Sequence, residues 1–289
     1  MTTILQAIIL GMVQGLTEFI PISSSAHLIL VPWLFGWKDQ ALTSLSFDVA
    51  LHLGTLIAVL WFFSADWVRL FRAGWASLLE RSVGDDVDRR LAWLLVISCI
   101  PGGIAGVLGE SKIEQLFHQP NTPITAQALI VMALIIALLA AVLFAVERLA
   151  RHTREMTTIT FRDAIWIGLA QALAIFPGVS RSGSTITAGL ALGLKRDAAA
   201  RFSFLLGAPI IAGAGLKSLW DIFQQYQVGA GFTQTDLLIF PVGIIAAAIS
   251  GYFCVKYLLL YIQKHSLDIF VYYRWALAAL IIIIAFTRG

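Results

Sequence analysis

The sequence predicts an all-α polytopic membrane protein of two inverted-topology repeats, each a re-entrant helical hairpin followed by three transmembrane helices. Three observations support this: few charges, six long apolar stretches, and two interrupted apolar pairs that resemble each other. Of 289 residues, 59% are hydrophobic and 13% are charged, whereas a soluble domain has roughly 25% charged residues. The net charge of +3 is too small to indicate a nucleic-acid partner, so we expect none.

Six apolar stretches approach or reach the roughly 20 residues that a helix needs to cross a bilayer. The predicted spans are 46–63, 91–109, 127–146, 203–219, 237–260 and 269–286. Four further apolar segments are shorter and form two pairs, 4–20 with 26–36 and 164–176 with 184–194. A proline followed by serines interrupts each pair, and proline ends a helix. Each pair is therefore predicted to be a broken hairpin.

The charges of the connections orient the chain. The basic regions are 64–90, 147–163, 195–201 and the last connection, which includes Lys256, Lys264 and Arg274. The connections with at most one lysine and no arginine are 37–45, 110–126 and 220–236. Because basic loops stay cytoplasmic, the second hairpin must enter and return on the cytoplasmic side and the first on the outer side.

An internal repeat supports this arrangement. Segment 7–16 aligns with segment 164–173 without a gap. The matched pairs are Gln14 with Gln171, Phe19 with Phe176 and, after a slip of one residue, Pro21 with Pro177 and Ser24 with Ser180. We expect one membrane domain, 1–289, with repeat one at 1–150 (hairpin 4–36) and repeat two at 160–289 (hairpin 164–194). Three spans after each hairpin invert the second repeat, so the hairpin tips would meet near the membrane midplane.

Glu18 is the strongest candidate for a functional group, because ionisable side chains within apolar segments are costly. Gln14 lies four residues earlier and shares its helix face. The pair could coordinate a divalent cation or orient a nucleophile. The alternative is a protonated carboxyl group that is hydrogen-bonded to the break.

A serine cluster and a histidine follow the first break. Ser23, Ser24 and Ser25 stand where the second half-helix begins, and serine is a preferred N-cap. Capping explains one of the three serines but not the cluster with His27. Amides at a helix start also bind phosphate. His27 lies within reach of Ser24 across one helical turn, which suggests a catalytic pair.

Arg181 is the counterpart at the second break. Together with Ser180, Ser182 and Thr185 it resembles a phosphate clamp made of a guanidinium fork and hydroxyl donors. The alternative is a structural ion pair between Arg181 and Glu18. Two weaker candidates, Asp48 and His52, stand four residues apart at the start of a span and could approach the site.

These motifs resemble those of a known family, the bacterial undecaprenyl-diphosphatases of the bacitracin-resistance type. The stretches that carry the resemblance are QGLTEF at 14–19, PISSSAH at 21–27 and PGVSRSGST at 177–185. They are similar to the family's (E/Q)xxxE, serine–histidine and PGxSRSxxT motifs. The resemblance extends over essentially the whole chain.

The resemblance implies a membrane phosphatase. It would hydrolyse undecaprenyl diphosphate to undecaprenyl phosphate, recycle this carrier for peptidoglycan synthesis, and confer bacitracin resistance. It further implies three groups of residues. These are Glu18 and Gln14 for a divalent cation, Mg²⁺ or Ca²⁺; Glu18, Ser24 and His27 for catalysis; and Arg181, Ser180, Ser182, Ser23 and Thr185 for the diphosphate. Gln14 carries no charge, so a cation bridging Glu18 and the substrate is favoured over one held by two carboxylates.

In-line phosphoryl transfer fits both the residues and the resemblance. Ser24 is the preferred nucleophile, with His27 or Glu18 taking its proton; His27 or water as nucleophile stays an alternative. The inverted repeat also fits a flippase or transporter of a polyprenyl phosphate. A small-anion transporter would leave His27 unexplained. We expect the inner membrane as location and an outward-facing catalytic tip. The oligomeric state stays open, and a homodimer is one of its alternatives.

Overall fold

The structure is a computed structural model that describes residues 2–37, 39–117, 125–227 and 236–288. This part of the chain forms helices and one isolated bridge between Arg154 and Leu194. The α-helices are α1 (Thr2–Phe19), α2 (Ser24–Phe35), α3 (Leu45–Phe62), α4 (Ser64–Leu79), α5 (Val87–Phe117), α6 (Ala126–Leu149), α7 (Phe161–Ala172), α8 (Arg181–Ala191), α9 (Arg196–Gln227), α10 (Asp236–Ile262) and α11 (Asp268–Arg288). Two 3-10 helices are η1 (Met156–Thr158) and η2 (Leu173–Ile175).

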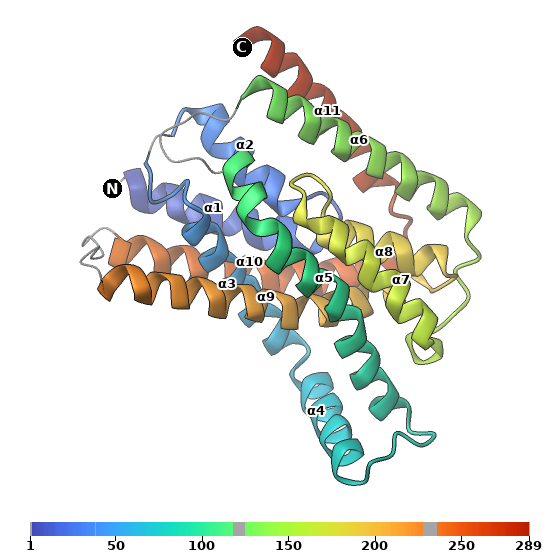
Figure 1. Ribbon diagram of the computed structural model, residues 1–289. Helices are drawn as coiled ribbons and strands as arrows, with labels where there is room; N and C mark the ends of the chain where they lie inside the picture. The colour runs from blue at the N-terminus through green and yellow to red at the C-terminus, as the bar shows by residue number, and fades with distance from the viewer. Residues whose placement is uncertain (1, 38, 118–124, 228–235, 289) are drawn as a thin grey trace.

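The helices confirm the predicted all-α polytopic membrane protein. Within the described residues, six helices are long and apolar enough to cross a membrane: α3, α5, α6, α9, α10 and α11. They coincide with the six predicted spans. Three follow the broken pair α1–α2 and three follow the broken pair α7–α8 (Figure 1). The repeat boundaries and the inversion of one half in the membrane stay predictions. Lys38, His118 and parts of two sparsely charged connections, 118–124 and 228–235, lie outside the described residues.

One helix falls where a basic connection was predicted. Helix α4 packs antiparallel on the first part of α5, and this helical pair projects from the body of the molecule (Figure 1). Leu70 is buried on the packed face, where Trp93 Nε1 also donates to Ser77 Oγ at 2.8 Å. The opposite face exposes Phe71 and Trp75. Its mixture of charges and aromatic residues lowers the mean hydropathy, which is why an apolar-stretch criterion missed this helix.

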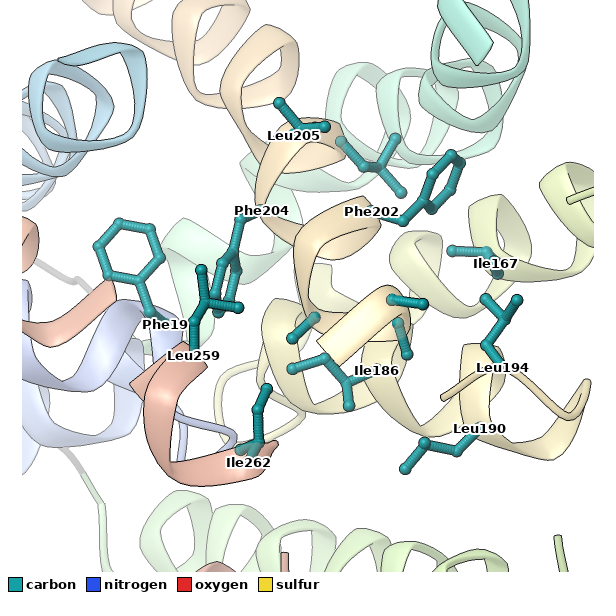
Figure 2. Close-up of a cluster of buried hydrophobic side chains, with 14 of the residues drawn as sticks. Phe19, Ile167, Ile186, Leu190, Leu194, Phe202, Phe204, Leu205, Leu259 and Ile262 are labelled. Atoms are coloured by element: carbon teal, nitrogen blue, oxygen red, sulfur yellow. The ribbon is translucent and has the colours of Figure 1, made fainter. Parts of the chain in front are cut away.

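The largest core cluster joins both broken pairs to the spans. Figure 2 shows Phe19 of α1, Ile186 of α8, Phe204 of α9 and Leu259 of α10 converging in it. The rings of Phe19 and Phe204 meet edge to face with centroids 5.3 Å apart, a preferred aromatic geometry. Their chain neighbours, Glu18 and Ser203, are buried polar residues. The core therefore fixes the two backbones from which the polar site is built.

Close backbone contact holds α1 against α10. A Cβ atom at Gly15 would lie 2.0 Å from Ser250 Oγ and 2.5 Å from the Ala247 carbonyl oxygen. One turn earlier, a Cβ atom at Gly11 would lie 2.4 Å from the Gly243 carbonyl oxygen. Small residues at this spacing allow membrane helices to approach closely. The contact fixes the end of α1, where Glu18 lies.

Candidate active site

The two breaks end in the same local structure. Ser23 caps α2 with φ 75° and ψ 92°, and Ser180 caps α8 with φ 70° and ψ 110°. The Oγ atom of each serine accepts from the backbone N–H three residues later, that of Ala26 at 3.5 Å and that of Gly183 at 3.1 Å. A positive φ in a non-glycine residue costs about 1–3 kcal/mol, and such residues gather at functional sites. Both tips therefore contain a strained cap serine, which indicates that both belong to a functional site.

The caps correct the predicted alignment of the repeats. The gapless alignment that pairs Phe19 with Phe176 also pairs the two cap serines, Ser23 and Ser180. The predicted slip, which placed Ser24 on Ser180, is wrong, because the N-cap conformation sets the register and the prolines do not. The residue that corresponds to Ser24 is therefore Arg181.

These two corresponding residues meet at one carboxylate. Glu18 Oε1 accepts from Arg181 Nη2 at 2.7 Å, and Glu18 Oε2 accepts from Ser24 Oγ at 2.7 Å. Gln14 Nε2 donates to the same Oε2 atom at 3.1 Å, and Arg181 Nη1 donates to the Ser203 carbonyl oxygen at 2.8 Å. Glu18 is only 5% exposed. The ion pair between Arg181 and Glu18, one of the two alternatives for Arg181, is thus present.

His52 of α3 also reaches the carboxylate. Its Nε2 atom lies 3.4 Å from Glu18 Oε2. Its Nδ1 atom pairs with the backbone carbonyl oxygen of Asp48 at 2.7 Å and must carry the proton there, because a carbonyl oxygen only accepts. Of the two weaker candidates, His52 therefore joins the site through its side chain, while Asp48 orients the ring through its backbone.

His27 is bound by a residue that the sequence did not indicate. Its Nδ1 atom donates to the Ser23 carbonyl oxygen at 2.6 Å. In the neutral ring, Nε2 then accepts from the Tyr273 hydroxyl at 2.6 Å, and the two rings stack with centroids 5.7 Å apart. Ser24 donates to Glu18 and not to His27, so the expected contact between the serine and the histidine is not formed. One feature of the sequence could have indicated Tyr273: it stands next to an arginine within an apolar span.

The predicted diphosphate-binding hydroxyls are turned toward protein partners. Ser182 Oγ donates to the Ile20 carbonyl oxygen of the first tip at 3.2 Å and lies 3.3 Å from Ser180 Oγ. Thr185 Oγ1 donates to the Arg181 carbonyl oxygen at 2.7 Å and lies 2.7 Å from Ser203 Oγ. These contacts brace the second tip around Arg181. Binding of phosphate by these hydroxyls and by Ser23 stays a prediction.

Arg274 of α11 was predicted in the wrong environment. It was counted among the basic residues of the last connection, but its residue surface is 1% exposed. Its Nη1 atom donates to the Pro21 carbonyl oxygen at 3.3 Å, and its Nη2 atom donates to that of Gly178 at 3.1 Å. Its Nε atom donates to the Ile136 carbonyl oxygen at 3.2 Å. A charge count cannot distinguish a loop arginine from one that is folded between two breaks.

The donors at the site fit a cation that shares its ligands with substrate. No group of three or more His, Cys, Asp or Glu residues in the described ranges could hold a metal ion. Gln14 Nε2 donates to the Glu18 carboxylate, and the Oε1 atom of the same amide group is buried without a hydrogen-bond partner. Mg²⁺ typically uses one or two carboxylates together with substrate phosphates and water. Glu18 and Gln14 fit such a shared site and not a cage made by protein alone.

A model of the family described as bacitracin resistance protein BacA matches residues 7–280 of the chain. This chain belongs to that family. The matched range contains both tips as well as Tyr273 and Arg274 of α11, so the BacA family resemblance includes the whole site.

Several relatives of this BacA chain are named undecaprenyl-diphosphatase. One from Thermomicrobium roseum is 44% identical, and the alignment covers 98% of this chain and 99% of the relative. One from Moorella thermoacetica is 44% identical over 99% of both chains. One from Methanobrevibacter smithii is 43% identical over 96% of both chains. Similarity thus extends over nearly the full length of each of these relatives.

Proposed function

We propose that this chain hydrolyses undecaprenyl diphosphate to undecaprenyl phosphate and inorganic phosphate. The reaction recycles the lipid carrier for peptidoglycan synthesis and confers resistance to bacitracin. The observation that carries the proposal is the meeting of Ser24 and Arg181, from opposite tips, at the Glu18 carboxylate. Membership of the family and the names of the relatives supply the lipid substrate.

The geometry supports Ser24 as nucleophile and Glu18 as proton acceptor. Ser24 Oγ attacks the terminal phosphorus, the bond from that phosphorus to the bridging oxygen breaks, and undecaprenyl phosphate leaves. The hydroxyl proton passes to Glu18 Oε2, to which it is already hydrogen-bonded at 2.7 Å. Water then attacks the phosphorus of the phosphoserine, the bond from that phosphorus to Ser24 Oγ breaks, phosphate leaves, and Glu18 returns its proton to Ser24 Oγ. A nucleophile activated by a neighbouring base is the usual arrangement for such covalent catalysis.

The second tip chiefly stabilises the negative charge on the phosphoryl group during its transfer. Positioning and electrostatics dominate phosphoryl transfer, and Arg181 brings a guanidinium fork to the carboxylate that faces the nucleophile. The first amides of α2 and α8 add donors for phosphate oxygens. His27 provides a second proton acceptor at the start of α2 when the Tyr273 hydroxyl leaves its Nε2 atom.

A divalent cation, Mg²⁺ or Ca²⁺, belongs to the proposal. Glu18 and Gln14 would hold it, because Gln14 Nε2 donates to the Glu18 carboxylate while the Oε1 atom of the same amide group is buried without a hydrogen-bond partner. When bound, the cation would neutralise charge on the diphosphate.

We further propose the bacterial inner membrane as the location, with the catalytic tip open to the outer, periplasmic side. The scarcity of Lys and Arg residues in 37–45, 110–126 and 220–236 supports this orientation. A homodimer is not needed to complete the site, because the contacts described above all lie within one chain.

Release of phosphate from undecaprenyl diphosphate by the purified protein tests the function. With Mg²⁺ or Ca²⁺ present, the wild type should release phosphate, and Ser24→Ala should be slower by at least about 10³-fold. Arg181→Ala should be slower by about 10²-fold or more, and His27→Ala should also be impaired. Ser25→Ala is the matched control and should keep near-normal activity. No release by the wild type would refute the phosphatase, whereas equal effects of Ser24→Ala and Ser25→Ala would refute the nucleophile.

A polyprenyl-phosphate flippase is the second candidate. Two halves with a broken helix pair and three spans each are typical of transporters with a site at the midplane. In vesicles, the Ser24→Ala variant separates the two functions, because its hydrolysis is expected to be at least about 10³-fold slower. Movement of labelled undecaprenyl phosphate between leaflets by this variant would favour a flippase; its absence would favour the phosphatase alone.

A further inference from the structure

Arg274 is a buried cation whose hydrogen bonds go to backbone oxygens. The acceptors are the carbonyl oxygens of Pro21, Gly178, Val179 and Ile136, at 3.1–3.4 Å. An arginine within a membrane span is costly and is a functional candidate by default. Its residue surface is 1% exposed, so bulk solvent does not reach it. The fold retains this charge at a place where four carbonyl groups converge.

The acceptors are related by the internal repeat. In the gapless alignment set by the two caps, Pro21 corresponds to Gly178, and each stands two residues before its cap serine. One guanidinium group therefore binds the same backbone position in both tips, with Nη1 on the first tip and Nη2 on the second. This places Arg274 where the two halves meet.

The same tips carry the reacting groups. Ser24 begins α2, three residues after the first carbonyl group, and Arg181 begins α8, three residues after the second. A shift of one tip past the other would separate Ser24 from Arg181, although each tip alone would keep its cap. Ser182 Oγ makes a further link from the second tip to the Ile20 carbonyl oxygen of the first at 3.2 Å.

We propose that Arg274 is a positioning residue that fixes the register of the two tips, so that Ser24 and Arg181 meet at Glu18. The planar fork of arginine suits this role, because it presents donors in two fixed directions. Lysine has a single charged centre and cannot match both directions. For its kinetic consequences, this inference rests on the proposed phosphatase activity.

Kinetics of Arg274→Met and Arg274→Lys test the role. Misplacement by about 1 Å can cost about 10² in rate, so we expect kcat per folded molecule to fall about 10²-fold in Arg274→Met. KM should change less than about threefold, because each tip alone can still contact the substrate. Arg274→Lys should recover part of kcat. Unchanged kcat per folded molecule in Arg274→Met, with only a lower melting temperature, would overturn the proposal.

Arg148→Met is the matched control. Arg148 is a half-exposed arginine that pairs with Asp268 at 2.9 Å and covers the Phe144 ring, outside the tips. Its loss should lower the melting temperature and leave kcat unchanged. If Arg148→Met lowered kcat as much as Arg274→Met, the effect would be general loss of structure, and the proposal would fail.

Cross-linking tests the register without any activity. Ile22→Cys and Val179→Cys, in a chain whose Cys99 and Cys254 are replaced by alanine, place one thiol in each tip. A bifunctional thiol reagent whose length matches their separation should join them readily when Arg274 is present and much more slowly in Arg274→Met. An unchanged rate would overturn the inference, whatever the phosphatase assay gives. Slower cross-linking in a protein that releases no phosphate would keep the inference and refute the proposed function.

Discussion

Several donors converge on the buried carboxylate group of Glu18. Arg181 binds one carboxylate oxygen, and Ser24 and Gln14 bind the other. His52 adds a fourth side chain 3.4 Å away. A carboxylate offers about four acceptor sites, so the hydrogen bonds from Arg181, Ser24 and Gln14 use most of its capacity. The substrate must therefore displace or share one of these donors when it binds.

Tyr273 gives a prediction at the scale of one residue. Tyr273→Phe removes the hydroxyl that donates to His27 Nε2 but keeps the stacked ring. We expect a loss of about 2- to 10-fold in kcat, as for one hydrogen bond, with little change in the melting temperature. Steady-state phosphate release measures this change in kcat. Tyr272→Phe, at an exposed neighbouring position, should have no effect; an equal loss there would contradict the assignment.

Helix α9 gives a prediction at the scale of an element. Gly207 leaves room for the arginine of the second tip: a Cβ atom there would lie 2.1 Å from Arg181 Nη1. The displaced atoms belong to the end of a flexible side chain, so Gly207→Ala should fold normally and yet move the guanidinium away from Glu18. We expect kcat/KM to fall by about 10²-fold.

Gly213→Ala, on the same helix, is the control for Gly207→Ala. No atom lies within 4 Å of the Cβ atom that it would add, and alanine favours a helix over glycine. Activity should be unchanged and the melting temperature equal or slightly higher. Equal activity in the two variants would show that Gly207 does not position Arg181.

The base of the second hairpin gives a prediction about pH. Arg154 Nη2 donates to Asp163 Oδ2 at 2.6 Å, and Asp163 accepts from the Thr160 N–H at 2.8 Å in a capping box at the start of α7. Burial alone would raise the pKa of Asp163, but the hydrogen bonds from Arg154 and Thr160 outweigh it, and the pKa lies below its ordinary value.

Because the pKa of Asp163 is lower in the folded chain than in the unfolded chain, its stabilising contribution is present at neutral pH. The contribution is lost as pH falls below about 4, through the folded pKa. Asp163→Asn should therefore lower the melting temperature at pH 7, and the difference from wild type should shrink toward pH 3. Asp85→Asn, at an exposed loop position, should show no such difference. A difference that is independent of pH would contradict the ionic origin.

The whole molecule gives a prediction about orientation. The basic connections and the sparsely charged ones should lie on opposite sides of the membrane. A thiol reagent that cannot cross the membrane should label Lys38→Cys from outside intact cells and Arg151→Cys only after the cells are opened. Labelling of both from the same side would contradict the orientation. Arg274 no longer belongs to this count, because it is buried between the tips.

The sequence by itself determined the all-α membrane class, the six spans, the two breaks and most residues with chemistry. These features are local, since the length and composition of an apolar stretch decide whether it can span a bilayer. Glu18, Ser24 and Arg181 stood out because ionisable and polar groups are costly in such stretches. The family motifs then indicated the lipid diphosphate.

Only the tertiary structure decided which atoms meet. It paired Ser24 with Glu18 instead of His27, brought His52 to the carboxylate, and set the register of the tips by their caps. It also placed Tyr273 and Arg274 of the last helix among residues of the first hairpin. These contacts join residues that are far apart in the chain, and they depend on how helices pack. A local pattern of apolar and polar residues does not encode that packing.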